Sequence, residues 1–351
     1  MEWSENNPMG VDGFEFVEYA AEESRALARL FERMGFVAIG RHRSKDVMLY
    51  RQGDINFIIN HEADSFARGF ARVHGPSVCA IGLRVKNAAD AFDRAVALGA
   101  EPYLGQPGPM ELNIPAIHGV GRSLIYLIDH YAHDSIYDVD FIPIEGAPFH
   151  PAGAGMTGID HLTNNVQVGH MDHWAGFYER IFNFREIRYF DIHGKATGLR
   201  SRAMVSPCGK VRIPINEPAD KKSQIQEYLD IYHGEGVQHI ALSSRDIYAT
   251  VEALREAGVE FMDVPYTYYQ AVNERIPWHR EDLQRLQRNR ILIDGAVEES
   301  GGLLLQIFTQ TVIGPIFFEI IQRKGHDGFG EGNFQALFEA IERDQLKRGV
   351  I

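Results

Sequence analysis

The stretch Val237-Gln238-His239-Ile240-Ala241-Leu242 has a counterpart 159 residues upstream, Val78-Cys79-Ala80-Ile81-Gly82-Leu83. Both stretches are apolar enough to be buried strands, and the later one has a histidine where the earlier one has an alanine. At the same offset Gly99 corresponds to Gly258, and each glycine follows a segment with helical spacing of apolar residues. An offset that persists over this length indicates an internal duplication, so one folding unit is expected twice in the chain.

Other matched segments give the order of elements within each copy. Residues 49–60 correspond to 205–216, and both segments have a glycine between two apolar runs, as a β-hairpin requires. Helical periodicity precedes each hairpin and follows each of the two matched strands. We therefore expect an α+β fold of tandem βαβββ repeats that forms two open-barrel domains, 1–150 and 151–351. The Pro-, Gly- and Ala-rich segment 143–154 is the expected linker.

Composition excludes several classes of partner. The chain has 351 residues, of which 45% are hydrophobic and 24% charged, and a formal net charge of −13. A negative chain without a long Lys/Arg run does not suit nucleic acid or an anionic membrane surface. The longest apolar stretch, 303–321, is interrupted by polar residues, glycine and proline, and is expected to form two strands and a turn rather than a membrane span. Two cysteines and an acidic start without a signal-peptide pattern favour the cytoplasm.

Three residues of the second half have the types and settings of metal ligands. His161, His239 and Glu319 each interrupt an otherwise apolar, strand-like segment. Two imidazoles and one carboxylate form the facial triad that holds iron(II) by one side and leaves three coordination positions open. The first half has Ala80 in place of His239 and Gly13-Phe14 in place of His161. Histidines needed only for folding would be expected in both copies, so we predict a metal site in the second half and none in the first.

Each ligand candidate also has a simpler explanation. A single histidine in a strand is more often part of the core than a ligand. A buried glutamate can pair with an arginine, here Arg323 or Arg185. The joint occurrence of the three residues in one half favours the metal. Asp160, beside His161, points to the opposite face of its strand by alternation and is not expected to be a ligand.

Polar residues in other apolar segments are candidates for a pocket beside the metal. Alternation along 303–308 places Leu304, Gln306 and Phe308 on one face, which suits an aromatic ring that carries a hydroxyl group. The alternative role for this amide is to bridge backbone groups. Four further candidates, each of which could instead satisfy a turn, are Ser201, Asn216, Gln224 and Gln238.

The C-terminal part combines a glycine-rich segment with a helical pattern. Gly328-Phe329-Gly330-Glu331-Gly332-Asn333-Phe334 leads into a segment with apolar residues at i, i+3, i+4 and i+7. Asn333 is a suitable N-cap. A helix over 333–346 would dock on the core and, hinged at the glycines, would act as a lid that excludes water from the iron site.

Six motifs, spread over the second half, carry a family resemblance. They are Pro214-Ile-Asn-Glu-Pro218, Ser223-Gln-Ile-Gln-Glu-Tyr228, Gly236-Val-Gln-His-Ile-Ala241, Leu305-Gln-Ile-Phe-Thr309, Phe318-Glu-Ile-Ile-Gln-Arg323 and Gly328-Phe-Gly-Glu-Gly-Asn-Phe334. Together they resemble the bacterial branch of the 4-hydroxyphenylpyruvate dioxygenase family, which has the vicinal oxygen chelate, or glyoxalase-like, fold. The resemblance covers nearly the whole chain and is densest from residue 156 to 345.

The resemblance implies an activity and a role for each candidate residue. One Fe(II) per chain would be held by His161, His239 and Glu319. The enzyme would convert 4-hydroxyphenylpyruvate and O2 to homogentisate and CO2 by decarboxylation, ring hydroxylation and side-chain migration, a step of tyrosine and phenylalanine breakdown. Polar groups that would act on the substrate, directly or through neighbouring side chains, are Gln306, Asn216, Ser201, Gln224 and Gln238. The residues that would bind the substrate are Phe308, Phe317, Phe329, Asn333 and Phe334. Of these, Phe308 and Phe329 would lie on either side of the substrate's ring.

Three other functions remain open on the residues alone. Hydroxymandelate synthase shares the fold, the metal and the substrate but oxidises the side-chain carbon; Phe308 and the Gln/Asn set favour homogentisate. An extradiol ring-cleaving dioxygenase has a similar triad and repeat but lacks the keto-acid pocket motifs. A metal-free binding or resistance protein of this fold would not need an intact triad. The first half, without a metal, is a candidate assembly surface for a homo-oligomer, a dimer or tetramer.

Overall fold

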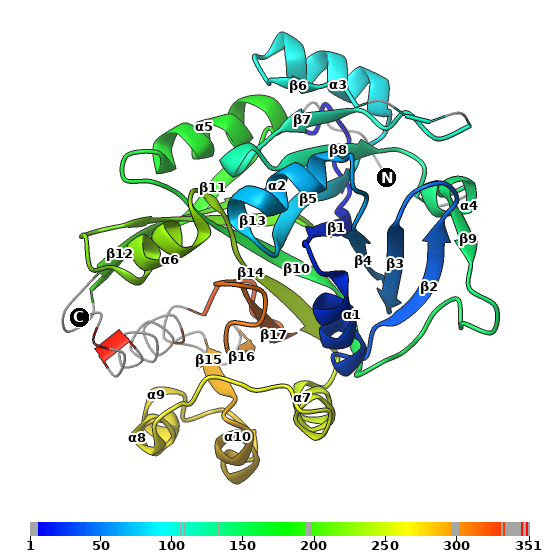
Figure 1. Ribbon diagram of the computed structural model, residues 1–351. Helices are drawn as coiled ribbons and strands as arrows, with labels where there is room; N and C mark the ends of the chain where they lie inside the picture. Colours follow the sequence, from blue (N-terminus) through cyan, green and yellow to red (C-terminus); the bar gives the residue numbers. More distant parts are fainter. Residues whose placement is uncertain are drawn as a thin grey trace.

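Two mixed β-sheets, one from each half of the chain, form the framework of the protein (Figure 1). The computed structural model describes residues 6–105, 107–108, 110–131, 134–193, 198–295, 302–330, 333, 345–346 and 349. No strand or helix occupies residues 144–155, which join the two sheets. The domain boundaries at 150 and 151 stay a prediction.

The first sheet has nine strands in the order β6-β7-β8-β5-β1-β4-β3-β2-β9. These strands are β1 (Phe14–Ala20), β2 (Val37–His42), β3 (Val47–Gln52), β4 (Ile55–Asn60), β5 (Ser77–Arg84), β6 (Pro102–Tyr103), β7 (Ala116–His118), β8 (Leu124–Ile128) and β9 (Phe141–Pro143). The helices of this half are α1 (Ser24–Arg33), α2 (Phe66–His74), α3 (Ala88–Ala97), the 3-10 turn η1 (Val120–Arg122) and α4 (Ile136–Asp140).

The second sheet has eight strands in the order β11-β12-β13-β10-β14-β17-β16-β15. These strands are β10 (Met156–Asn165), β11 (Arg185–His193), β12 (Gly198–Val205), β13 (Arg212–Pro218), β14 (Gly236–Ser244), β15 (Leu292–Gly295), β16 (Leu303–Phe308) and β17 (Phe317–Lys324). The helices are α5 (Met171–Phe182), α6 (Gln224–Tyr232), α7 (Ile247–Glu256), α8 (Tyr266–Gln270), α9 (Val272–Arg275) and α10 (Leu283–Asn289). Figure 1 shows α7 to α10 grouped at one end of this half.

The two sheets have the same topology, which confirms the duplication. In the first, β1 pairs in parallel with β4 and antiparallel with β5, and β5 pairs in parallel with β8. In the second sheet, β10 pairs in parallel with β13 and antiparallel with β14, and β14 pairs in parallel with β17. Each half thus contains two βαβββ units joined through their first strands. The predicted α+β fold with curled, open-barrel sheets is confirmed.

Strand pairing corrects one residue match made from the sequence. Phe16 pairs with Gly82 of β5, whereas His161 pairs with Ala241 of β14. Since Gly82 and Ala241 are equivalent in the repeat, Phe16 rather than Gly13-Phe14 occupies the place of His161. The loops that separate the strands differ in length between the halves, so the offset at β1 is smaller than the offset at β5. The earlier match used too large an offset.

Local signals explain where the long helices begin and end. Side chains of Asn87 and Asp246 cap the first turns of α3 and α7. Gly99 and Gly258 follow these helices with φ of 89° and 82°, a conformation that favours glycine. Both helices lie where the periodicity predicted them. Residues 303–321 form β16, a turn and the start of β17, as predicted. Within the described residues, no helix is long and apolar enough to cross a membrane.

Contacts between the halves hold the two sheets together. The rings of Phe57 on β4 and Phe318 on β17 stack with centroids 5.9 Å apart. On the other side of the interface, the ring of His74 stacks on Tyr232 at 4.5 Å, and its Nδ1 lies 2.7 Å from the Tyr232 carbonyl oxygen. The core therefore runs continuously from one half to the other. Most of the predicted lid helix, 333–346, lies outside the described residues.

Candidate metal centre

Three neighbouring strands bring His161, His239 and Glu319 together. His161 on β10 and Glu319 on β17 both pair with Ala241 of the strand between them, β14, and His239 lies two residues earlier on β14. The Nε2 atoms of the two histidines are 3.4 Å apart, and they lie 3.3 Å (His161) and 3.4 Å (His239) from Oε2 of Glu319. Each of the three side chains is 2% exposed. The sequence placed these residues in one site, and the structure does the same.

The geometry of this cluster fits a metal ion. Its three ligating atoms form a nearly equilateral triangle, the arrangement of three ligands that lie about 2.1 Å from one ion on one side of it. A buried carboxylate also needs a positive charge beside it. Arg323, one of the two arginines considered as its partner, instead pairs with Asp160 at 2.7 Å. The donor set, two imidazoles and one carboxylate, is that of a non-haem iron(II) site.

Burial and the neighbouring charges set the protonation of the three side chains. Burial raises the pKa of Glu319, but the charge of His161 and hydrogen bonds from both imidazoles hold this pKa below its usual range. Burial lowers the pKa of His161, but the carboxylates of Glu319 and Asp160 outweigh it and raise the pKa. Burial keeps the pKa of His239 low. Glu319 is therefore ionised and His239 neutral at pH 7, which are the forms that bind metals, whereas a metal ion must displace the proton that the two carboxylates favour on His161.

Hydrogen bonds behind the cluster orient both imidazoles. Nδ1 of His161 lies 2.8 Å from Oδ1 of Asp160, and Nδ1 of His239 lies 3.0 Å from Oε1 of Gln238. Arg323 donates to both carboxylate oxygens of Asp160, at 2.7 and 2.8 Å, and to the carbonyl oxygen of Gly328 at 2.5 Å. An Nδ1 proton bound to an oxygen leaves Nε2 of each imidazole to face the centre of the cluster, where it would bind a metal ion after losing any proton it carries.

Gln306 connects the cluster to the glycine-rich segment. Its Nε2 donates to Oε1 of Glu319 at 2.8 Å and to the carbonyl oxygen of Phe329 at 3.3 Å. Its Oε1 accepts a 2.8 Å hydrogen bond from Nδ2 of Asn333, and Oδ1 of Asn333 accepts another from the Tyr268 hydroxyl. The amide therefore contacts a ligand candidate and one backbone group, and its role toward a substrate stays a prediction.

Aromatic rings surround the two histidines. The ring of Phe317 stacks on His239 with centroids 4.8 Å apart, and Phe329 meets His161 edge-on at 5.6 Å. Phe308 lies 6.2 Å from Phe317. These rings make the surroundings of the cluster apolar, which strengthens electrostatic interactions within it.

A second group of predicted residues has buried polar atoms without partners. In the described structure no hydrogen-bond partner is found for Oγ of Ser201, Oδ1 of Asn216 or Oε1 of Gln224. Ser201 and Asn216 lie side by side on β12 and β13. Buried polar atoms are rarely left unpaired in a native protein, so these atoms are expected to bond a water molecule or a polar ligand.

Comparisons with known proteins identify the family. Residues 5–142 match the model described as "Hydroxyphenylpyruvate dioxygenase, HPPD, N-terminal", and residues 158–274 match "Glyoxalase/Bleomycin resistance protein/Dioxygenase superfamily". A 4-hydroxyphenylpyruvate dioxygenase of Pseudomonas aeruginosa is 57% identical over 99% of this chain and 98% of its own length. The chain belongs to the 4-hydroxyphenylpyruvate dioxygenase family. The resemblance inferred from the six motifs is thus confirmed.

Some relatives of this chain have names other than 4-hydroxyphenylpyruvate dioxygenase. Hemolysin VllY of Vibrio vulnificus is 59% identical over 98% of both chains. A solved structure of a triple mutant of 4-hydroxymandelate synthase from Streptomyces coelicolor matches with a TM-score of 0.83 and 25% identity, over 96% of this chain and 100% of that chain. The fold is therefore shared over 96% of this chain and the whole of the synthase chain.

Most of the residues proposed from the family resemblance gather around the cluster, and some were missed. Phe334 lies outside the described residues, and a ring sandwich by Phe308 and Phe329 stays a prediction. The sequence analysis missed Thr163, whose Oγ1 is 3.0 Å from Nε2 of His239, and Asn165, whose Oδ1 accepts from Asn216 at 3.2 Å. Strand alternation from His161 would have placed both on its face.

Asp160→Asn is expected to weaken metal binding about 10- to 100-fold, the usual cost of changing a residue that orients a ligand in a metal site. An amide keeps the shape of Asp160 but loses the charge that pairs with Arg323 and orients His161. The measurement is an Fe(II) titration against a competing chelator. Asp172→Asn is the control, because Asp172 also pairs with an arginine but its side chain is 84% exposed. Equal affinities for both variants and the wild type would contradict the role of Asp160.

Proposed function

We propose that this chain is an Fe(II)-dependent dioxygenase that converts 4-hydroxyphenylpyruvate and O2 to homogentisate and CO2. The observation that carries the proposal is the buried His161–His239–Glu319 cluster, set beside unpaired polar atoms in a member of this family. When bound, iron(II) supplies the redox chemistry with O2 and a Lewis-acid centre for the 2-oxo acid group. The reaction would be a step of tyrosine and phenylalanine breakdown.

The chain's own residues would hold, orient and shield the reactants. His161, His239 and Glu319 hold the iron, and the Gln306 amide fixes the carboxylate of Glu319 through a 2.8 Å hydrogen bond. The rings of Phe308, Phe317 and Phe329 would keep water away from the reacting centre, which protects a reactive intermediate.

The polar end of the pocket would recognise the substrate by its oxygen atoms. Hydroxyl and amide groups of Ser201, Asn216 and Gln224 have unused hydrogen-bonding capacity and are buried. A phenol hydroxyl or a carboxylate supplies the acceptors and donors that these groups need. Gln238, which already bonds His239 and Asn216, would act by positioning them rather than by touching the substrate.

A second candidate function is the oxidation of the same substrate to 4-hydroxymandelate. It is favoured by the similarity of the whole fold to a 4-hydroxymandelate synthase. The relatives at 51–57% identity that are named 4-hydroxyphenylpyruvate dioxygenase favour homogentisate. Both reactions need the same cluster, so the product distinguishes them.

The deciding experiment loads the protein with Fe(II) under anaerobic conditions, adds 4-hydroxyphenylpyruvate and O2, and identifies the products by mass spectrometry. Homogentisate with one CO2 released is the expected result. Formation of hydroxymandelate would support the same site but the second candidate function. If the iron-loaded protein took up no O2, the chain would instead be a ligand-binding protein. A cytoplasmic location, a first domain at 1–150 without metal, and a dimeric or tetrameric assembly complete the proposal; sedimentation measures the last of these.

A further inference from the structure

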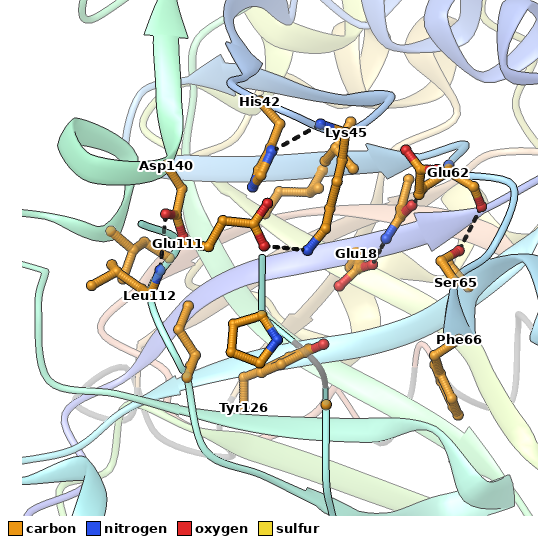
Figure 2. Close-up of a pocket in the computed structure, with 18 of the residues that line it drawn as sticks. Glu18, His42, Lys45, Glu62, Ser65, Phe66, Glu111, Leu112, Tyr126 and Asp140 are labelled. Carbon is orange, nitrogen blue, oxygen red and sulfur yellow. Dashed lines mark hydrogen bonds and ion pairs between the residues drawn. The ribbon is translucent and has the colours of Figure 1, made fainter. Parts of the chain in front are cut away.

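The first half of the chain contains its own cavity, of about 490 Å³. It lies within the first sheet and is lined by residues of β1, β3, β4 and β8, together with the segment before β7 (Figure 2). A volume of this size is typical of small-molecule sites. The cavity belongs to the half for which no role in the proposed reaction has been assigned.

Strand register shows that this cavity is the structural counterpart of the metal centre. Phe16 and Gly82 pair as His161 and Ala241 do, and Gly82 pairs with Tyr126 as Ala241 pairs with Glu319. The places of the three metal-ligand candidates are therefore taken by Phe16, Ala80 and Tyr126. The rings of Phe16 and Tyr126 lie 5.8 Å apart and form part of the wall. Aromatic residues thus line the cavity of the first half at places where the metal-ligand candidates stand in the second.

Polar groups at the inner end of the cavity are also counterparts of the second-half pocket. Ala20 pairs with Asn60 as Asn165 pairs with Asn216, so Asn60 takes the place of Asn216. Glu18 pairs with Ala80 as Thr163 pairs with His239, so a carboxyl group takes the place of the Thr163 hydroxyl. Nδ2 of Asn60 donates to Oε1 of Glu18 at 2.7 Å.

Glu18 is a buried acid without a cationic partner. Its side chain is 8% exposed, and in the described part of the chain it forms no ion pair with lysine, arginine or histidine. Lys45, the nearest cation, has its Nζ 2.6 Å from Oε2 of Glu111 at the other side of the cavity. Burial raises the pKa of Glu18. Figure 2 shows the carboxyl group of Glu18 and the ring of Tyr126 facing the same space. An acid in such a setting gains most from a ligand that brings a positive charge.

The rest of the lining also favours a cation. Asp140, 7% exposed, accepts only a backbone hydrogen bond from Leu112 among the contacts described, and burial raises its pKa. Nδ1 of His42 accepts from the backbone nitrogen of Lys45 at 3.2 Å, and burial lowers the pKa of this imidazole, so His42 is neutral. The remaining acids at the rim are Glu62 and Asp64. The only lysine of the lining is paired, so the cavity carries a net negative charge and repels anions.

We propose that this cavity is a second small-molecule site, which binds an organic ammonium ion with an aromatic body. The ammonium group pairs with Glu18 beside Asn60, and the ligand's ring packs against the aromatic wall that Phe16 and Tyr126 form. Apolar neighbours such as Ile58 and Ile136 complete the wall around it. This ligand is opposite in charge to the 2-oxo acid proposed for the metal centre, so one compound does not suit both sites.

A matched pair of probes tests the charge preference on the iron-loaded, full-length protein. Phenethylamine and 3-phenylpropionate have the same ring and the same two-carbon spacer but opposite charges. Isothermal titration calorimetry is expected to show binding of the amine and at least about tenfold weaker binding of the acid. Because the amide removes the charge that pairs with the ammonium group, Glu18→Gln is expected to weaken amine binding about tenfold or more. Glu32→Gln, an exposed change on α1, is the control and leaves binding unchanged.

A second measurement locates the amine without any variant. Methyl NMR on isotope-labelled isoleucines is expected to show shifts at Ile58 and Ile136, which line the cavity, and none at Ile320 beside the metal centre. Shifts confined to Ile320, loss of binding in Glu319→Gln but not in Glu18→Gln, or no amine binding at millimolar concentration would each overturn the proposal. These outcomes do not depend on the product of the proposed dioxygenase reaction, so the two proposals fail separately.

Discussion

Replacing His161 with alanine is expected to abolish both iron retention and turnover. His161 provides one of three ligating atoms, and its Nε2 lies 3.3 Å from the Glu319 carboxylate. Changes to residues that only orient a ligand cost about 10- to 100-fold in metal affinity, so loss of a ligand should cost more than about 100-fold. Iron content after desalting, measured by mass spectrometry, and O2 uptake with 4-hydroxyphenylpyruvate give the two readouts.

The control for this prediction is His130→Ala, because the His130 side chain is 57% exposed and lies in the first half. Circular dichroism distinguishes loss of the ligand from loss of the fold, since truncation of a buried imidazole also leaves a cavity. The His161→Ala protein should be folded and free of iron. A folded variant that retains stoichiometric iron and wild-type turnover would remove His161 from the site.

The duplication made most of the fold predictable. Strands β5 and β14 retain similar apolar residues, and the hairpins β3–β4 and β12–β13 retain a glycine at the turn, Gly53 and Gly209. Burial and turn geometry restrict what these positions accept, so the likeness survives in the sequence. The first strands β1 and β10 share no such pattern. Their register follows from pairing with the next strand, and only the structure shows that Phe16 corresponds to His161.

The candidate metal cluster could be predicted because its residue types are costly in apolar strands. The pairing of two supporting residues, Asp160 and Arg323, could not be predicted, and the reason is local geometry. Alternation places Asp160 and His161 on opposite faces of β10. A register shift between Ile159 and His161 interrupts that alternation, and the two side chains meet at 2.8 Å. Arg323 was considered only as a partner of Glu319, whereas it joins Asp160 to the backbone of Gly328.

The same arrangement links the metal-ligand candidates to the glycine-rich segment at two points. Arg323 joins Asp160, behind His161, to the carbonyl oxygen of Gly328. Gln306 joins Glu319 to the carbonyl oxygen of Phe329 and to Asn333. A shift of this segment would therefore disturb two of the three ligands. The segment is expected to affect the geometry of the metal centre as well as access to it.

Gly330→Ala is expected to lower turnover about 10- to 100-fold, because a displacement of about 1 Å at a reacting centre can cost that much. Gly330 has φ of 73°, and a methyl group added there would overlap Oε1 of Gln306 and lie 3.0 Å from Cδ2 of Leu304. Either Gln306 or the glycine-rich segment must move, and either movement would disturb the hydrogen bonds of Gln306 to Glu319 and to the carbonyl oxygen of Phe329. The readouts are kcat with 4-hydroxyphenylpyruvate and the Fe(II) dissociation constant.

Gly209→Ala is a matched control for this change. Gly209 has φ of 74°, so alanine there has the same backbone cost, about 1–2 kcal/mol, but the added methyl group has no atom within 4 Å. Both variants should lose similar thermal stability from the backbone, and only Gly330→Ala should lose turnover beyond that. If the two variants turned over equally, contact between Gly330 and Gln306 would have no part in catalysis. If Gly330→Ala lost turnover but bound Fe(II) normally, the segment would act on the substrate pocket and not through Glu319.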